Sequence, residues 1–196
     1  MELFIARHAQ TEENKAGIVI GGELHGTLSI EGIDQAKKLA WRLKDEKIDF
    51  IYSSDLKRAV DTTDEIAKFH PETPIVLLPT LRERKQGARS GMTFAEIADK
   101  KAKEINGPKV IYDGLETRNA IYERAKEILQ KIKGKHLDGK ILIVGHGGIN
   151  RVLISLITEQ ELSSIERQHE TGLNHFEINA DGTHKVHLSN DTSHLK

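Results

Sequence analysis

The chain has 196 residues, with 29 Lys or Arg, 30 Asp or Glu and a formal charge of −1 at pH 7. It contains no cysteine, which excludes thiol catalysis, thiolate metal sites and disulfide bonds. The balanced charge gives no general reason to bind nucleic acid or an anionic membrane, and no apolar run approaches the roughly 18–20 residues of a membrane span.

The first half of the chain alternates between apolar runs typical of buried strands and apolar residues at helical spacing. In chain order we expect a strand over 2–7, a helix over 30–43, a strand over 49–53, a helix over 56–67 and a strand over 75–78. Ser29 is placed to cap the first of these helices, and Ser54 and Asp55 are placed to cap the second.

The second half opens with an irregular, charged region over about 82–118. Within it, Thr93 and Glu96 have the spacing of a capping box, which predicts one helix. The elements that follow are a helix over 121–132 that ends before Gly134, a strand over 140–145, a helix over 149–157, and strands over 173–178 and 185–188 on either side of an Asp181-Gly182 turn.

Strands that alternate with helices of about 12–15 residues predict an α/β fold, with a mostly parallel central sheet and helices on both faces. We expect a single domain over 1–196, with a small helical insertion at about 82–118 over one edge of the sheet. The first apolar run stops at Arg7, unlike a signal peptide, and this favours a cytoplasmic protein. A short edge strand could pair with a second copy of the chain, so a homodimer stays open.

Polar residues suited to phosphate chemistry follow four of the predicted strands, at the edge where open α/β sheets bind ligands. They are Arg7 and His8 after the first strand, Arg58 after the second, Glu83 after the third, and His146, Gly147 and Gly148 after the fourth. Arginine binds phosphate oxygens through two donors at once, and amides at a helix start add further donors. A histidine can carry a phosphoryl group covalently, and a nearby carboxyl can protonate the leaving oxygen.

Five segments, in this order, resemble the motifs of one family. They are Arg-His-Ala-Gln-Thr-Glu-Glu-Asn at 7–14, Leu-Ser with Gly32, Gln35 and Ala36 at 28–36, Ser-Ser-Asp-Leu-Lys-Arg-Ala at 53–59, Leu-Arg-Glu at 81–83, and Gly-His-Gly-Gly at 145–148. On these segments the chain resembles the histidine phosphatase superfamily, also called phosphoglycerate mutase-like. The ending Asn-Asp-Thr-Ser-His-Leu at 190–195 is similar to that of phosphatase-type members. The resemblance implies the three-layer sandwich of that family.

The resemblance also implies roles for individual residues. By it, His8 is the phosphorylated nucleophile, and Arg7, Arg58 and His146 bind the phosphoryl group, with His146 counted among the catalytic residues. Glu83 stands at the acid/base position, Asn14 belongs to the rim of the phosphate pocket, and Gly147 offers its amide. Neither a metal nor a cofactor is implied, because the two arginines and His146 supply the positive charge. Ala9 departs from the glycine that usually follows the nucleophile.

Three functions fit these residues. The first is a metal-independent phosphomonoesterase that hydrolyses a small phosphorylated metabolite through a phosphohistidine. The second is a cofactor-dependent phosphoglycerate mutase, which returns the phosphoryl group to a different oxygen and which uses the same inner residues. The mutases have a longer insertion after the acid, whereas Glu116 follows Glu83 by only 33 positions here, which favours the phosphatase. The third is a phospho-ligand binding module without catalysis.

Other interpretations stay open at this stage. Glu83 could form a surface ion pair with Arg82 or Arg84 in place of acting as an acid. A group of basic residues could hold a substrate carboxylate: Arg84, Lys85, Arg89 and Arg118. His25 and His175 could line the mouth of the pocket. Sugar phosphates, phosphoglycerates, nucleotides, a cobalamin-precursor phosphate and phosphoproteins all remain possible substrates.

Overall fold

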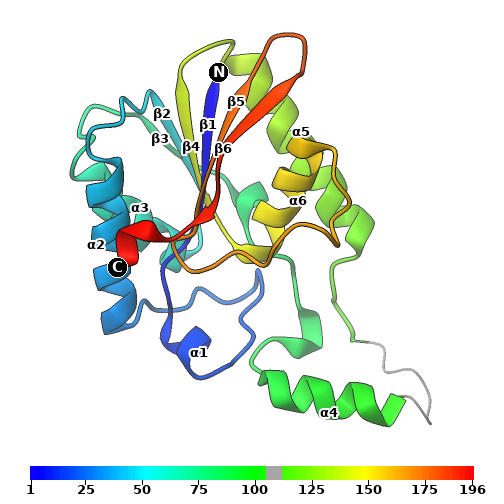
Figure 1. Ribbon diagram of the computed structural model, residues 1–196. Helices are drawn as coiled ribbons and strands as arrows, with labels where there is room; N and C mark the ends of the chain where they lie inside the picture. The colour runs from blue at the N-terminus through cyan, green and yellow to red at the C-terminus, as the bar shows by residue number, and fades with distance from the viewer. Residues whose placement is uncertain (105–111) are drawn as a thin grey trace.

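The computed structural model describes residues 1–104 and 112–196, and its elements alternate between strands and helices (Figure 1). In the first half these are β1 (Glu2–Arg7), α1 (Glu12–Lys15), α2 (Ile30–Leu43), β2 (Phe50–Ser53), α3 (Lys57–Ala67), β3 (Ile75–Leu77) and the 3-10 turns η1 (Pro79–Leu81) and η2 (Gly87–Arg89). In the second half they are α4 (Phe94–Glu104), α5 (Arg118–Lys135), β4 (Lys140–Gly145), α6 (Gly147–Thr158), β5 (Leu173–Ile178), β6 (His184–Asp191) and η3 (Ser193–Leu195).

The strands form one six-stranded sheet in the order β3-β2-β4-β1-β5-β6. The pairs β2/β3, β2/β4 and β1/β4 are parallel. β5 is antiparallel to both of its neighbours, β1 and β6, and it is the one strand among those described that points in the opposite direction. The predicted mostly parallel sheet is therefore confirmed. Arg7 at the end of β1 pairs with Gly145 at the end of β4, so the residues that follow these two strands leave the sheet side by side.

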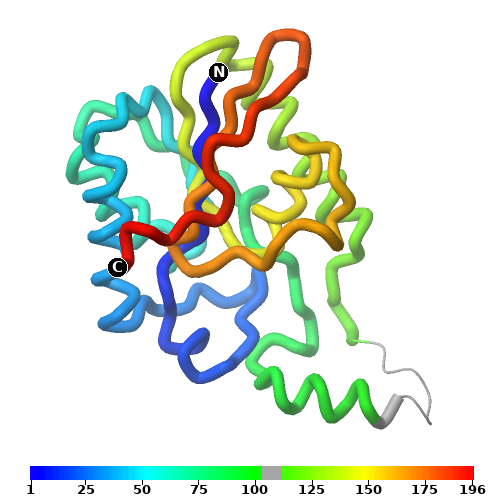
Figure 2. Tube along the Cα trace, viewed as in Figure 1, coloured from blue at the N-terminus to red at the C-terminus, as the bar shows by residue number. Residues whose placement is uncertain are grey.

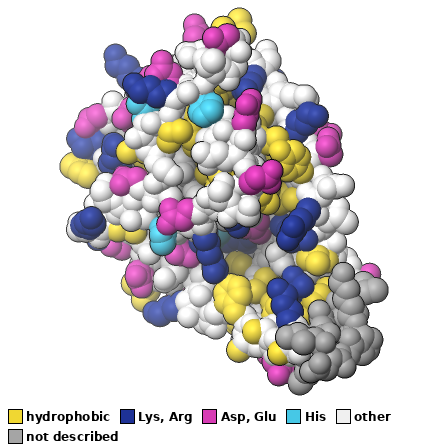
Figure 3. All heavy atoms as spheres, turned by 45° about the vertical axis from the view of Figure 1, so that its right-hand side comes forward, with side chains coloured by type: hydrophobic (Ala, Val, Ile, Leu, Met, Phe, Trp, Pro, Cys, Tyr) yellow, Lys and Arg dark blue, Asp and Glu magenta, His cyan; other side chains and the backbone are white. Residues whose placement is uncertain are grey.

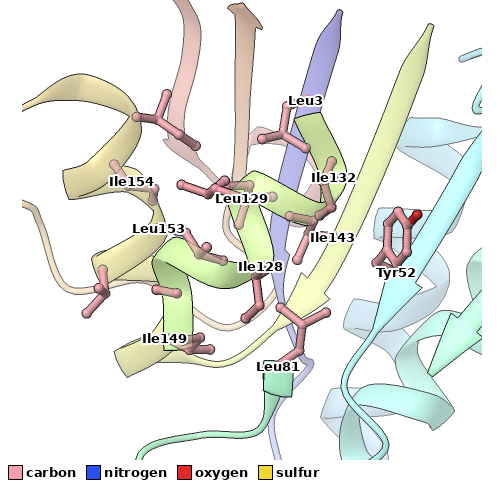
Figure 4. Packing of buried hydrophobic residues seen from close by; sticks show 14 of the residues in the cluster. Leu3, Tyr52, Leu81, Ile128, Leu129, Ile132, Ile143, Ile149, Leu153 and Ile154 are labelled. Atoms are coloured by element: carbon pink, nitrogen blue, oxygen red, sulfur yellow. The ribbon is translucent and has the colours of Figure 1, made fainter. Parts of the chain in front are cut away.

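Helices cover both faces of the sheet, because successive residues of its buried strands point to opposite sides. Leu3 and Ile5 of β1 pack under α5 and α6, whose apolar side chains close one core layer (Figure 4). Phe4 and Ala6 pack against α2 and α3 on the other face. A strand buried on both faces needs the continuous apolar run that the sequence shows at this segment.

The start of α3 differs from the prediction. Neither Ser54 nor Asp55 caps this helix, which begins at Lys57 after Leu56 without a capping side chain. Both candidate caps have other partners: the Ser54 hydroxyl lies 2.8 Å from Nε2 of His146, and Asp55 forms a two-point ion pair with Arg82. The prediction was wrong because these long-range partners compete with the helix end for the same oxygens.

Further boundaries shift by a few residues. The helix expected to end before Gly134 continues through it to Lys135, because glycine at an exposed helical position lowers stability only modestly. The last strand extends to Asp191, and η3 then packs beside α2 (Figure 2). The helix after β4 starts earlier than expected, at Gly147, with His146 as its first flanking residue.

The region predicted as an insertion contains η2 and α4, and its residues 105–111 lie outside the described part of the chain. The capping box that opens α4 is confirmed, since Thr93 accepts from the Glu96 amide and Glu96 accepts from the Thr93 amide. Backbone bonds of Val19 to Met92 and of Phe94 to Gly17 tie α4 to the loop after α1, away from the sheet (Figure 1). No helix among the described residues is long and apolar enough to cross a membrane.

Candidate active site

The predicted site residues come together at the carboxyl edge of the sheet, around a cavity of about 440 Å³. Six of them line it: Arg7, His8, Asn14, Arg58, Glu83 and Gly147. The seventh, His146, lies behind His8, with the two ring centroids 5.0 Å apart. Parallel strands bring together residues that are far apart in the sequence, because their carboxyl ends share one edge.

The hydrogen bonds of His8 decide which ring nitrogen can act as a nucleophile. Nδ1 lies 2.7 Å from the backbone oxygen of Ala9, which can only accept, so Nδ1 carries the proton. Nε2 then has the lone pair, and it accepts from Nε of Arg58 at 3.3 Å. Burial, together with the charges of Arg58 and Arg7, holds the pKa of His8 well below its usual value of 6.5. The ring is therefore neutral and nucleophilic at pH 7.

Arg58 is held rigidly although it is a long side chain. It is 1% exposed, and its guanidinium donates to the backbone oxygens of Gly21, Leu24 and His25. Burial lowers the pKa of Arg58 to about 10, which leaves the group cationic at pH 7. Arg58 has no carboxylate within ion-pair distance among the described residues. A buried cation that carbonyl groups hold in place in this way is suited to binding an anionic ligand.

Arg7 and His146 each leave one buried nitrogen without a partner among the described residues. Arg7 donates to the Gln168 oxygen and pairs with Glu170, while its Nε has no partner. His146 contacts Ser54 through Nε2, and its Nδ1 has no partner. Buried polar atoms are almost always paired, and the Nε of Arg7 belongs to a residue that lines the cavity, so it is a donor that a ligand could use. The oxygens of a phosphoryl group are suitable acceptors for a guanidinium Nε.

His146, like Arg58, is buried. Burial, with the nearby charges of Arg58 and Arg7, holds the pKa of His146 well below 6.5, so its ring is neutral at pH 7. The expectation that His146 supplies positive charge was therefore wrong, because a buried imidazole beside two arginines does not bind a proton. His146 directly precedes α6, and the next residue, Gly147, is the first of that helix and lines the cavity.

Glu83 faces the cavity and does not form the surface ion pair that was left open. Its Oε2 accepts from the Gly148 amide at 2.8 Å, and its Oε1 accepts from the Arg84 amide at 2.7 Å. Arg82 is engaged by Asp55. The carboxyl is thus fixed next to the start of α6, within the same cavity as His8.

The close approach of Glu83 to α6 requires glycine at position 148. A Cβ added there would collide with Oε1 of Glu83 and lie 3.2 Å from its Cδ. We expect Gly148→Ala to displace the carboxyl and to lower kcat/KM on alkyl phosphates by about 10- to 100-fold, since misplacement by about 1 Å can cost 10²-fold. Gly147→Ala is the matched control: a Cβ there would be no closer than 3.7 Å to any neighbour, so the loss should be much smaller. Equal losses in the two variants would show that Glu83 is not the affected group.

Several positions were not assigned correctly from the sequence. Arg167 and Gln168 line the cavity from the segment between α6 and β5, where the sequence carries no recognisable motif. His25 contributes only its backbone oxygen to Arg58 and does not line the cavity. His175 stacks on Phe4 at 4.1 Å and bonds to Glu2, at the opposite end of β1. The idea that these two histidines line the mouth was therefore wrong.

Ala9 and Asn14 have local structural reasons for their positions. Ala9 packs with Leu28 and Ala36 in a small apolar cluster, so its methyl group does not narrow the cavity. Asn14 forms a reciprocal capping box with Thr11 at the start of α1, which holds it at the cavity wall.

Comparisons with known proteins agree with this geometry. The family model of the histidine phosphatase superfamily (branch 1) matches residues 3–192. The chain is 31% identical to a probable phosphatase of Schizosaccharomyces pombe, over 100% of this chain and 96% of the relative. It is 35% identical to a metal-independent phosphoserine phosphatase of Arabidopsis thaliana, over 81% of this chain and 69% of the relative. The structure of a phosphoserine phosphatase from Entamoeba histolytica, in complex with 3-phosphoglyceric acid, superimposes with a TM-score of 0.81 at 27% identity, covering 100% of this chain and 99% of that one.

Proposed function

Because the chain belongs to the histidine phosphatase superfamily (branch 1), we propose that its cavity hydrolyses small phosphate monoesters through a phosphohistidine at His8. The chain is a phosphoric monoester hydrolase, as its relatives are. The observation that carries the proposed chemistry is the tautomer of His8: Nδ1 is occupied by a backbone oxygen, and the lone pair of Nε2 lies beside a buried arginine.

In the first step, Nε2 of His8 attacks phosphorus in line with the ester oxygen. The N–P bond forms as the P–O ester bond breaks, and Glu83 in its protonated form gives its proton to the departing oxygen. In the second step, the Glu83 carboxylate takes a proton from water while the water oxygen attacks phosphorus. The N–P bond then breaks, the electron pair returns to Nε2, and inorganic phosphate leaves.

Positive charge and fixed donors stabilise the transferring phosphoryl group. Arg58, Nε of Arg7 and the Gly147 amide border the cavity, and His146 lies directly behind His8. These groups are in place before the substrate arrives, so little reorganisation is needed when charge builds up on the phosphoryl oxygens. In this arrangement the arginines supply the charge that Mg²⁺ supplies in other phosphoryl-transfer sites.

The substrate is a small phosphorylated molecule, and the relatives named above indicate metabolites of the phosphoserine type. The chain has no cysteine and so forms no disulfide bond, as is usual for proteins of the cytoplasm, and we propose the cytoplasm as its location. Pairing of two copies along the exposed edge strand β6 is our proposal for the homodimer left open above.

A panel of phosphate esters, scored in parallel for free phosphate and for isomerised product, tests this function. We expect phosphate release to exceed isomerisation on every ester, to persist after exhaustive treatment with EDTA, and to be inhibited by vanadate, whose five-coordinate form resembles the in-line transition state. The His8→Ala protein, purified identically, controls for contaminating phosphatases. Isomerisation faster than phosphate release would instead make the chain a mutase, and strict dependence on a divalent metal would contradict the role given to the arginines.

A further inference from the structure

The cavity holds more arginines than one phosphoryl group needs. Besides Arg7 and Arg58, its wall includes Arg84, Arg151 and Arg167, and the only acidic side chain among the described lining residues is Glu83. Glu170 pairs with Arg7, so five arginines against Glu83 and Glu170 give a formal excess of three positive charges. A phosphate monoester carries about −1.5 to −2 at pH 7, so roughly one positive charge remains for a second anionic group.

The three outer arginines, Arg84, Arg151 and Arg167, have no counter-ion among the described side chains. No described carboxylate lies within ion-pair distance of any of them, and the nearby acids are engaged elsewhere. Glu170 pairs with Arg7, and Glu116 forms a two-point pair with Arg124 at 2.9–3.0 Å. Clusters of like charge without counter-ions lower stability, so their persistence at a cavity indicates a ligand that supplies the negative charge.

The hydrogen bonds of these arginines leave donors free for a ligand. Arg84 uses only Nε, which donates to the Glu116 backbone oxygen at 2.8 Å, and neither of its terminal nitrogens has a partner in the described structure. Arg151 donates through Nε and Nη2 to Ile165 and Leu162, which fixes its position. The guanidinium of Arg167 lies over the Phe94 ring at 5.4 Å. Burial and the charge of Arg89 lower the pKa of Arg84, which fits a cation lacking its counter-ion.

A second cavity of about 290 Å³ adjoins the first and shares two of these arginines with it. Arg84, Gly148 and Arg151 line both, and Arg118 and Ser163 are among the residues that complete the second one. None of its described lining residues is acidic. Figure 3 shows Lys and Arg side chains around a hollow on this side of the molecule. Arg84 and Arg151 thus lie where the cavity that contains His8 adjoins the second cavity, and Arg167 lies on the wall of the first.

We propose that Arg84, Arg151 and Arg167 form a second anion-binding subsite, which holds a carboxylate or a second phosphoryl group of the same small molecule whose ester is cleaved at His8. This inference rests on the proposed function, and it narrows the substrate to esters with a second negative charge. Esters that are neutral beyond the phosphate would leave these guanidinium groups without an anion, so they should bind more weakly.

The test compares ligand pairs in which one member has the second anionic group and the other lacks it. The first pair is 3-phosphoglycerate and glycerol 3-phosphate, and the second is fructose 1,6-bisphosphate and fructose 6-phosphate. Calorimetric Kd values are measured on the His8→Ala protein, where no turnover interferes, and kcat/KM values on the wild type. We expect the doubly charged member of at least one pair to bind about 10- to 100-fold more tightly, the range of one or two charge-assisted hydrogen bonds. The pair that shows the preference identifies the carboxylate or the phosphoryl group as the second anion.

Variants test whether the preference for the doubly charged ligand depends on the outer arginines. Arg84→Gln and Arg167→Gln should each reduce the preference at least about threefold, and Arg84→Lys, which keeps the charge, should retain part of it. Lys85→Gln removes the same charge at the next residue, outside both cavities, and should leave the preference unchanged. Equal Kd values within both pairs, or an equal loss in Lys85→Gln and Arg84→Gln, would overturn the subsite. Release of phosphate without any preference refutes only the subsite, whereas a preference in Kd without release from any ester refutes only the proposed function.

Discussion

The His8→Ala protein is expected to lose at least about 10⁴-fold in kcat/KM while keeping its fold. In the proposed mechanism Nε2 of His8 forms the N–P bond, and the other ring in the site, His146, does not line the cavity. The variant should keep its far-ultraviolet circular dichroism, because the His8 ring adds little apolar area to the core. His184→Ala, on the edge strand β6 and outside the cavity, is the matched control and should keep full activity.

Trapping the intermediate tests the same prediction directly. Wild-type protein mixed with ³²P-labelled substrate and quenched in base should retain label on histidine, since phosphohistidine is stable in base and labile in acid. No label is expected on His8→Ala. Label that survives on this variant would place the nucleophile elsewhere, with His146 as the next candidate.

Loss of the Glu83 carboxyl is expected to depend on the leaving group. An alkyl phosphate expels a strongly basic alkoxide that needs a proton in the transition state, whereas p-nitrophenolate leaves without one. General acid catalysis is worth about 10²–10⁴-fold, so Glu83→Gln should slow alkyl esters by about that factor and p-nitrophenyl phosphate far less. The glutamine has only one carbonyl oxygen for the amides of Arg84 and Gly148, but this structural effect is common to both substrates and cancels in their ratio.

The acidic limb of the pH profile reports on His8. It should follow protonation of this ring, and it should lie below pH 6.5 because burial and two arginines lower the pKa of His8. Glu23→Gln serves as a control for Glu83→Gln, because the Glu23 carboxylate accepts from Gln86, Gly87 and Ser90 and has no acid role. Equal losses on both esters in Glu83→Gln would mean that Glu83 only positions the 83–84 backbone.

Much of the inner site was predictable from the sequence, because most of its residues lie at the end of a strand with a clear local pattern or shortly after it. The apolar runs at 2–7 and 140–145 identify two buried strands, so Arg7, His8 and His146 must lie at their carboxyl ends. Glu83 is a weaker case. Its flanking arginines equally favoured a surface ion pair, and only the amide of Gly148, from 65 positions away in the chain, excludes that alternative.

The outer site was only partly predictable from the sequence. Arg84 was among the residues named as possible carboxylate ligands, but Arg151 on α6 and Arg167 after it share no spacing with Arg84. An arginine at the surface usually has no function beyond solvation. Whether such a residue has a counter-ion depends on which carboxylates fold close to it, as the pairs Arg7–Glu170 and Arg124–Glu116 show.

The sequence by itself predicted the sheet strands, the helices that cover them and most of the residues that the fold brings to the cavity, because hydrophobic periodicity and strand ends are local properties. Only the tertiary structure decided the tautomer of His8, the orientation of Glu83, the start of α3 and the free donors of the outer arginines. Each of these depends on a hydrogen bond or an ion pair between distant residues, and the competition among such partners is resolved only when the chain is folded.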